Sequence, residues 1–375
     1  MPSRLLLIGS CSIILCCFFI LFDRSNRTSF DMDQLSEALV IGISLTASYG
    51  TVSIRNDDGS FRDVARVDGD ENYRDMMLRF TFGSASHPAH VSHCKFFMEC
   101  RLTSTQSPPY NSMEDQWHDQ PRQWLRSARK LVSLPASPDV SILSELTRSL
   151  LNIATAHSPA TIASVVISYP ALPGLYAEDI ADVGHYLSLP MLDGNHVYQP
   201  RSIVSAYAGY GMGLCSSYTD QARCRKEGLT LPVRPTLFIE YTSTALFLHF
   251  ALMREAYNLA DPDVYTYNYF FRPEDHTTPD AEERLRKLRT RIIQLLHRRY
   301  SLFSGNPEPS EVITVLLTGE SSTSVVAESV ERAVKSAGFE IDLFGPTYPE
   351  FTVARGASEL AWRAFSLEFS EKMEM

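Results

Sequence analysis

Hydrophobic and polar positions along the chain predict two similar series of strands and helices. In the first series, two short strands at 38–44 and 51–54 are followed by a third at 61–67. An uninterrupted apolar run predicts a buried strand at 161–168. The pattern is typical of a β-meander at the start of a domain, with a further strand added later.

A second hairpin of strands at 235–250 opens the second series. It is followed by a long helix at 281–300 and a strand at 312–317. The repetition of a strand hairpin and helices predicts an α/β architecture with two similar lobes. Further helices are predicted at 124–134, 141–154, 178–187, 322–337 and 353–365.

Three stretches lack a clear period and are predicted to be irregular: 82–120, 216–228 and 262–280. The expected organisation is then a first lobe at 36–200 with an irregular insertion at 82–120, and a second lobe at 201–352. A closing helix at 353–370 is expected to pack back on the first lobe.

The amino-terminal segment 5–22 contains no charged residue over 18 positions. A helix of that length spans about 27 Å, which is enough to cross the apolar core of a bilayer. No small-x-small cleavage pattern follows, so an uncleaved transmembrane signal anchor is favoured over a cleaved signal or a buried helix. The expected protein is a single-pass membrane protein of the endoplasmic reticulum or secretory pathway, and its orientation stays open.

Composition narrows the expected partners. The chain has 375 residues and a formal net charge of −10, which disfavours binding to nucleic acid. Outside the apolar segment, Cys94, Cys100, Cys215 and Cys224 form two locally spaced pairs. They are either two disulfides of an oxidising lumen or free thiols of a cytosolic protein.

Five segments, in order along the chain, resemble one known family. They are 40–49 (VIGISLTASY), 162–189, 237–244 (LFIEYTST), 315–324 (VLLTGESSTS) and 348–358, which contains VARGAS. The chain resembles the nucleotide-binding domain of the seventy-kilodalton heat-shock (DnaK-like) chaperones, in the actin-like ATPase superfamily. The resemblance implies a two-lobed, ribonuclease H-like α/β fold with a cleft for ATP or ADP and Mg²⁺.

The motifs depart from the family pattern at positions that bind the metal ion and the phosphates in that family. Ser44 replaces the first metal-binding acid, and Thr46 replaces the first phosphate-loop glycine. The second motif keeps a carboxylate at Glu240, and the third has Glu320 in place of a glycine. The residues expected to line the cleft are Gly42, Ser44, Thr46, Ser48, Glu240, Thr242, Ser243, Thr244, Gly319 and Ser321.

These departures predict a degenerate nucleotide cleft that does not hydrolyse ATP, and no catalytic residue is assigned. The expected function is that of a membrane-anchored interaction or scaffold module that binds a protein partner, whose identity the sequence does not give. In an alternative, the hydroxyl groups of the cleft still hold a nucleotide and support slow ATPase activity.

A separate cluster suggests a second alternative. His87, His90, His93 and Cys94 place three imidazoles and a thiol within eight residues, and such groups bind transition metals. The string from His90 to Cys94 resembles the HxxHC motif of the fungal ustiloxin-type oxidases, which are membrane-anchored. That family has two copies of the motif and this chain has one, so a metal-dependent oxidase remains the weaker alternative.

Overall fold

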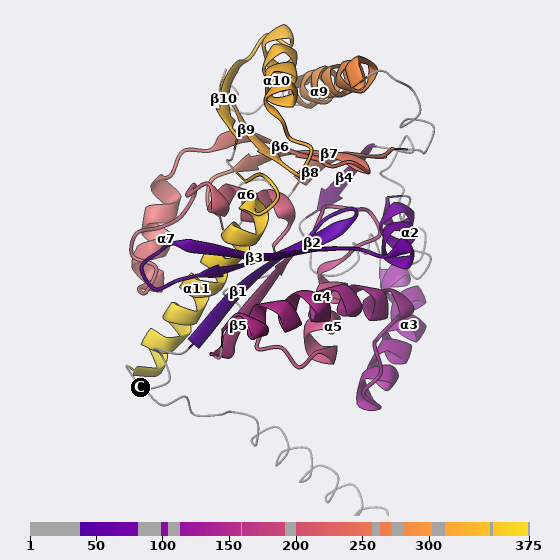
Figure 1. Cartoon of the computed structure of the whole chain (residues 1–375), viewed down its shortest axis with the longest axis vertical. Coiled ribbons are helices and arrows are strands. Elements are labelled where there is room, and N and C mark those ends of the chain that lie inside the picture. The colour runs from indigo at the N-terminus through magenta and orange to yellow at the C-terminus, as the bar shows by residue number, and fades with distance from the viewer. Residues whose placement is uncertain are drawn as a thin grey trace, which may run out of the picture. The chain divides into compact units, whose positions relative to one another are not determined.

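The computed structural model describes residues 38–81, 99–103, 113–158, 160–191, 200–256, 263–271, 281–301, 312–345 and 348–373 (Figure 1). From Leu39 onwards these residues belong to one structural unit. In the segments described, no helix is long and apolar enough to cross a membrane. The span predicted at 5–22 lies outside them, as do His87, His90, His93 and Cys94.

The first of two β-sheets contains β1 (Ala38–Leu45), β2 (Tyr49–Arg55), β3 (Phe61–Asp68) and β5 (Thr161–Ser168). Its strand order is β3–β2–β1–β5. β1 pairs antiparallel with β2, and β2 pairs antiparallel with β3, so these strands form the predicted meander. Nearly all of β5 is buried, which explains its continuous apolar sequence.

The second sheet contains β4 (Glu99–Thr103), β6 (Arg234–Tyr241), β7 (Ala245–Met253), β8 (Asp263–Phe270), β9 (Val312–Thr318) and β10 (Glu340–Phe344). Its strand order is β10–β9–β6–β7–β8–β4. β6, β7 and β8 form a second antiparallel meander, to which β4 adds an antiparallel edge strand. On the other side, β9 runs parallel to β6, and β10 runs parallel to β9.

The two sheets follow one plan. In each, the strand that follows the meander and a helical stretch lies beside the first strand of the meander: β5 beside β1, and β9 beside β6. β10 then extends the second sheet, and Met191 makes an isolated parallel bridge to Val165 of β5 at the corresponding place in the first. The expected α/β class with two mixed sheets is therefore confirmed.

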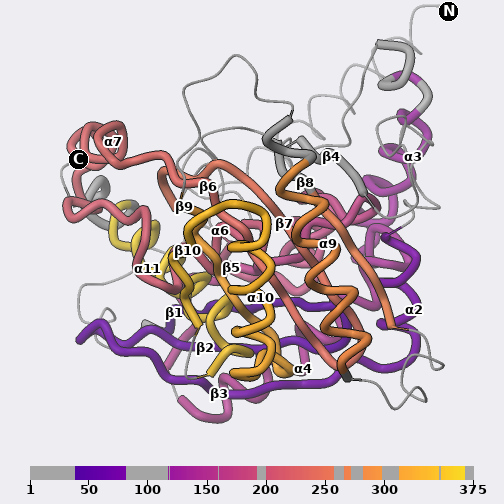
Figure 2. Tube along the Cα trace, turned by 90° about the horizontal axis from the view of Figure 1, so that it is seen from above, coloured from indigo at the N-terminus to yellow at the C-terminus, as the bar shows by residue number. Residues whose placement is uncertain are grey.

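Nine helices are described: α2 (Glu71–Phe80), α3 (Met113–Leu131), α4 (Pro138–Ala156), α5 (Ala177–Tyr186), α6 (Ser202–Gly209), α7 (Gln221–Thr230), α9 (Ala281–Ser301), α10 (Ser324–Ser336) and α11 (Thr352–Met373). They cover both faces of each sheet. α4 packs on the first sheet, which has α11 on its opposite face. α9 and α10 pack on the second sheet, as Figure 2 shows from above, and α6 covers its other face.

The backbone of α11 packs closely against the backbones of β1 and α6. A Cβ on Gly42 of β1 would lie 2.1 Å from the Ala354 carbonyl oxygen, and one on Gly356 would lie 1.7 Å from the Ser205 carbonyl oxygen of α6. Only glycine fits at such contacts. Gly42, expected in the nucleotide cleft, thus lies under α11, which packs on the first sheet.

Three stretches expected to be irregular contain regular elements. Residues 216–228 include most of α7, residues 262–280 include β8, and residues 82–120 include β4 and the start of α3. α7 buries only Gly228, so it has no apolar stripe from which a helix is predicted. β4 has five residues and belongs to the second sheet, although its segment was expected to be an insertion of the first lobe.

Candidate functional site

Two hairpin turns contain half of the residues predicted for a nucleotide cleft. The first turn (Thr46–Tyr49) joins β1 to β2, and the second turn (Thr242–Ala245) joins β6 to β7. Because β1 and β6 hold equivalent places in their sheets, the two turns are structural counterparts. Ser44 and Glu240 each lie two residues before a turn, so they are counterparts as well.

The two turns share one hydrogen-bond pattern. In the first, the Thr46 amide donates to the Tyr49 carbonyl at 2.9 Å, and the Thr46 hydroxyl donates to the same oxygen at 2.8 Å. In the second, the Thr242 amide and hydroxyl donate to the Ala245 carbonyl at 2.9 and 3.1 Å. Each threonine therefore closes its own turn with both its backbone and its side chain.

The same threonine hydroxyls also accept from amides of the turns. Thr46 Oγ1 lies 3.1 Å from the Tyr49 amide nitrogen and 3.4 Å from that of Ser48. Thr242 Oγ1 lies 2.8 Å from the Ala245 amide nitrogen and 3.3 Å from that of Thr244. Free amides in a turn form a nest for an anion such as phosphate. Here the chain's own side chains occupy those amides.

The remaining middle amide of each turn faces a glutamate. Glu320 Oε1 accepts from the Ser243 amide at 2.7 Å and from the Ser243 hydroxyl at 2.9 Å. In the first turn, the corresponding amide belongs to Ala47 and lies next to the carboxyl group of Glu240. Each turn thus has a carboxyl group of the chain beside its middle amide.

Glu240 is the most deeply buried acid at the site, with 2 % of its surface exposed. Its pKa is raised to about 8, mainly by burial and also by the nearby charge of Glu320, while the Ala47 amide acts in the opposite direction. Neither oxygen makes a hydrogen bond of regular geometry to a described residue. Glu240 is therefore mostly protonated at neutral pH.

Ser44, the counterpart of Glu240 in the first sheet, is fully buried at the end of β1. Its hydroxyl makes no hydrogen bond to the residues described. A serine supplies no negative charge, and a protonated Glu240 supplies none either. The two positions expected to hold the waters of Mg²⁺ are thus both neutral, and they do not fit that ion.

The third predicted segment packs directly on the second turn. Gly319 has φ +96°, and a Cβ there would lie 2.4 Å from the Tyr241 carbonyl oxygen, so this position requires glycine. The Ser321 amide donates to the same oxygen at 3.1 Å. The segments that contain Ser44, Glu240 and Gly319 therefore meet in one place.

Aromatic residues that the sequence did not single out complete the first turn. The Tyr73 hydroxyl of α2 donates to the Thr46 carbonyl at 2.8 Å. Tyr49 is fully buried, and burial raises its pKa well above the usual range, with Glu320 and Glu240 adding to the effect. The Arg66 guanidinium lies 4.1 Å from the centre of the Tyr49 ring. These tertiary contacts have no local signal in the sequence.

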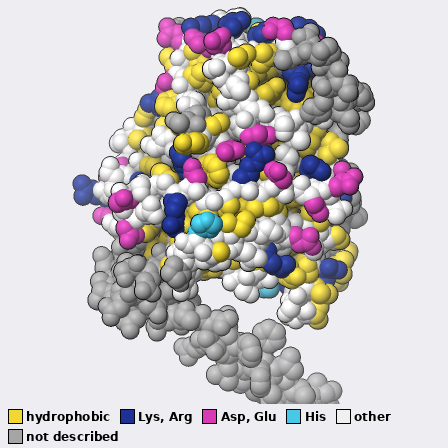
Figure 3. Space-filling view, in the orientation of Figure 1, with side chains coloured by type: hydrophobic (Ala, Val, Ile, Leu, Met, Phe, Trp, Pro, Cys, Tyr) yellow, Lys and Arg dark blue, Asp and Glu magenta, His cyan; other side chains and the backbone are white. Residues whose placement is uncertain are grey.

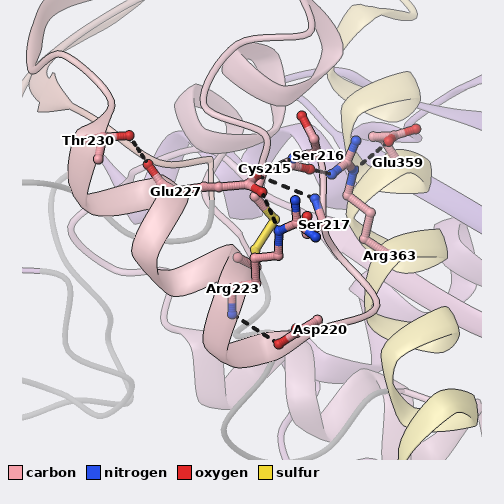
Figure 4. Close-up of a disulfide and its surroundings, with 10 residues drawn as sticks. Cys215, Ser216, Ser217, Asp220, Arg223, Glu227, Thr230, Glu359 and Arg363 are labelled. Atoms are coloured by element: carbon pink, nitrogen blue, oxygen red, sulfur yellow. Dashed lines mark hydrogen bonds and ion pairs between the residues drawn. A yellow bond between two sulfur atoms is a disulfide. The ribbon is translucent and has the colours of Figure 1, made fainter.

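One of the two expected disulfides is described. Cys215 and Cys224 are bonded, with Cα atoms 5.2 Å apart, and join the start of α7 to the loop before it (Figure 4). Nearby, Arg363 of α11 donates to the Cys215 carbonyl and pairs with Glu359 at 2.6 Å. The free-thiol alternative is therefore wrong for this pair. The side chains of Cys94 and Cys100 lie outside the description.

The predicted metal site is not part of this region. Across the described residues, no group of three or more His, Cys, Asp or Glu side chains is arranged to hold a metal ion. His87, His90, His93 and Cys94 lie outside the description, and a metal at that cluster stays a prediction. No protein-family model matches the chain, and no curated protein sequence matches it.

Proposed function

We propose that the chain is a degenerate, non-hydrolysing actin-like ATPase domain that works as a membrane-anchored interaction module. The observation that carries the proposal is the filling of both turns by the chain's own groups. Thr46 and Thr242 occupy amides of the first and second turns, and Glu320 occupies the Ser243 amide. A nucleotide would have to displace these contacts before its phosphates reached the backbone.

The fold assignment in this proposal is supported by the repeated plan of the two sheets. Each sheet has an antiparallel meander with the next strand beside its first strand. The resemblance to the heat-shock nucleotide-binding domain implies two such lobes, with a phosphate turn after the first strand of each. The equivalent positions of the first and second turns agree with that expectation.

Electrostatics support the loss of hydrolysis. Phosphoryl transfer relies on metal ions and cationic groups that neutralise charge developing on the transferred phosphoryl group. Ser44 is neutral, Glu240 is held protonated by burial, and Glu320 adds negative charge beside the second turn. Arg66, whose guanidinium lies over the Tyr49 ring, pairs with Asp68 at 3.0 Å and with Glu350 at 3.2 Å. This charge pattern disfavours an anionic ligand.

The proposal also includes a cellular location for the protein and a protein partner. The segment 5–22 is the proposed anchor, and the Cys215–Cys224 disulfide suits the oxidising lumen of the secretory pathway. A two-lobed domain without ATPase activity is suited to binding a protein partner. Nucleic acid is not an expected partner, because the net charge is −10.

The test is a thermal melt of the full chain in detergent with 0 to several millimolar Mg²⁺-ATP. Binding to the native state alone raises the melting temperature in a saturable way. The proposal predicts no shift beyond that caused by matched MgCl₂ and inorganic triphosphate. A saturable rise with Mg²⁺-ATP would overturn it and would support the slow ATPase, in which the hydroxyl groups of the cleft hold the nucleotide.

A further inference from the structure

Helix α3 presents its apolar residues to solvent. Trp117, Trp124 and Leu131 are 68, 72 and 77 % exposed and follow one another at seven-residue intervals. Residues seven apart lie on nearly the same face of a helix. Figure 3 shows hydrophobic side chains at the lower right edge of the molecule, over α3. Single exposed apolar residues are common, but a continuous row marks an interaction site.

The opposite face of α3 buries charge. Arg126 is 4 % exposed and pairs with Asp179 at 2.8 Å and with Asp182 at 2.6 Å, both on α5. On the same face, Lys130 pairs with Asp182 at 2.8 Å, and Arg122 pairs with Glu178 at 2.6 Å. Breaking such pairs leaves buried charges uncompensated. The ion pairs therefore fix the rotation of α3 and keep its apolar face outward.

The apolar face has the spacing of a helix-pairing seam. Trp117, Pro121, Trp124, Ala128 and Leu131 follow one another at intervals of four, three, four and three residues. This is the repeat by which helices pair along a seam. Bulky and small residues alternate along it. In an antiparallel pair, the tryptophans of one helix meet Pro121 and Ala128 of the other, so the seam is complementary to itself.

We propose that this row, the α3 seam, is the interface through which two copies of the chain associate. A two-fold axis near the middle of α3 would place each tryptophan against a small residue of the second copy. Each tryptophan presents on the order of 150 Å² or more. With Leu125, Leu131 and Val132, which are also mostly exposed, the seam approaches the roughly 800 Å² per partner of a standard interface.

The charge distribution favours a second copy over a lipid surface. Helices that lie on anionic membranes combine their apolar face with exposed Lys and Arg. On α3, Arg122, Arg126, Arg129 and Lys130 all lie toward the body, and each contacts a described residue of this chain. No described charged side chain of α3 borders the seam. An uncharged, self-complementary seam suits the same seam on another copy.

The test uses two differently tagged full-length chains, co-expressed and purified in detergent. Wild-type copies are expected to co-purify and to show twice the protomer mass by light scattering. Trp124→Glu is expected to lower co-purification about tenfold or more, because it places a charge in the centre of the seam. Val325→Glu is the matched control, since Val325 is an exposed apolar residue of α10, and it should leave association unchanged.

A mixed pair separates loss of the interface from misfolding. Near the two-fold axis, residue 124 of one copy lies close to residue 124 of the other, so Trp124→Glu and Trp124→Lys chains should associate with each other but not with themselves. A monomeric wild type, or equal retention by Trp124→Glu and Val325→Glu, would overturn the proposal. So would a monomer whose tryptophan emission shifts to the blue with lipid vesicles, which would assign the seam to the membrane.

Discussion

The first and second turns share their hydrogen bonds but differ in their surroundings. In the first turn Ala47 is fully buried, and α2 and the end of β3 contact the turn through Tyr73 and through the Gly69 amide, which donates to Ser48 at 2.7 Å. In the second turn Ser243 is exposed, although the Phe271 amide makes the contact equivalent to that of Gly69, at 2.8 Å. The same backbone hydrogen bonds thus occur in a buried first turn and in a partly exposed second turn.

The middle amides of the two turns meet carboxyl groups in different surroundings. In the second turn, a partly exposed Glu320 takes the place of an anion, and water still reaches the neighbouring residues. In the first turn, all four residues and the neighbouring Glu240 are buried. We therefore expect the first turn to matter for stability, and the second to be the easier of the two to reopen.

The largest expected effect is the pH dependence due to Glu240. Its pKa of about 8 in the folded protein exceeds its ordinary value of 4.5, so its contribution to stability is complete below about pH 4.5 and is lost as the pH rises through 8. The total is several kcal/mol at most, since each pKa unit corresponds to about 1.4 kcal/mol. Denaturant unfolding of wild type and Glu240→Gln from pH 5 to 9 measures it.

The difference in unfolding free energy between wild type and Glu240→Gln should fall from pH 5 to about pH 8 and level off above it, where Glu240 is ionised in both the folded and the unfolded state. Glu320→Gln is the control: it removes one of the causes of the shift, so the pH dependence should shrink without disappearing. A difference that stays constant from pH 5 to 9 contradicts a buried, protonated Glu240.

A matched pair of isosteric changes compares the two threonines directly. Thr46→Val is expected to cost about 2 kcal/mol, because it leaves the buried Tyr49 amide without its acceptor. Thr242→Val removes the same contacts beside an exposed residue, where water can replace some of them, and should cost about 1 kcal/mol. Urea unfolding of both variants checks the order, and equal losses would remove the distinction between the turns.

Tyr73→Phe tests whether the contact between Tyr73 and the first turn contributes to stability. Tyr73→Phe removes only the hydroxyl that donates to the Thr46 carbonyl, and the expected loss is about 1 kcal/mol. Tyr348→Phe changes a tyrosine that is more than half exposed and should cost less than about 0.5 kcal/mol. If both variants melted at the same temperature, the tether between α2 and the first turn would have no energetic role.

Among the changes at the two turns, Glu320→Ala is expected to cost the least stability. It frees the exposed Ser243 amide to bind water, so the loss should stay below about 1 kcal/mol. Its interest lies in anion binding, because the second turn then has a free amide and one negative charge fewer. Millimolar inorganic phosphate should raise the melting temperature of this variant more than that of the wild type, and the reverse order would contradict a turn filled by Glu320.

Periodicity predicted most of the strands because they are deeply buried. β5 begins and ends where the continuous apolar run at 161–168 predicted, and the meanders followed from short apolar strands separated by turn residues. Periodicity does not predict the orientation of α3. Its charged residues face the rest of the molecule, and its tryptophans face solvent. Ion pairs between α3 and α5 join residues more than 50 positions apart and leave no local pattern.

The sequence singled out the segments that form the two turns, but it did not predict the contacts within them. The departures from the resembled motifs at Ser44, Thr46 and Glu320 predicted which groups of a phosphate cleft would be missing. They did not show that Thr46 closes the first turn through its hydroxyl, or that Glu320 binds the Ser243 amide. Those contacts depend on how the backbone of each turn folds.

The chain's own side chains occupy amides of both turns, and we expect these contacts to prevent nucleotide binding. Isothermal titration of the full-length protein with Mg²⁺-ATP measures this directly. The account predicts no saturable heat for the wild type up to millimolar ATP. A saturable isotherm with one ATP per chain, lost when Thr46 and Thr242 are changed, would contradict it.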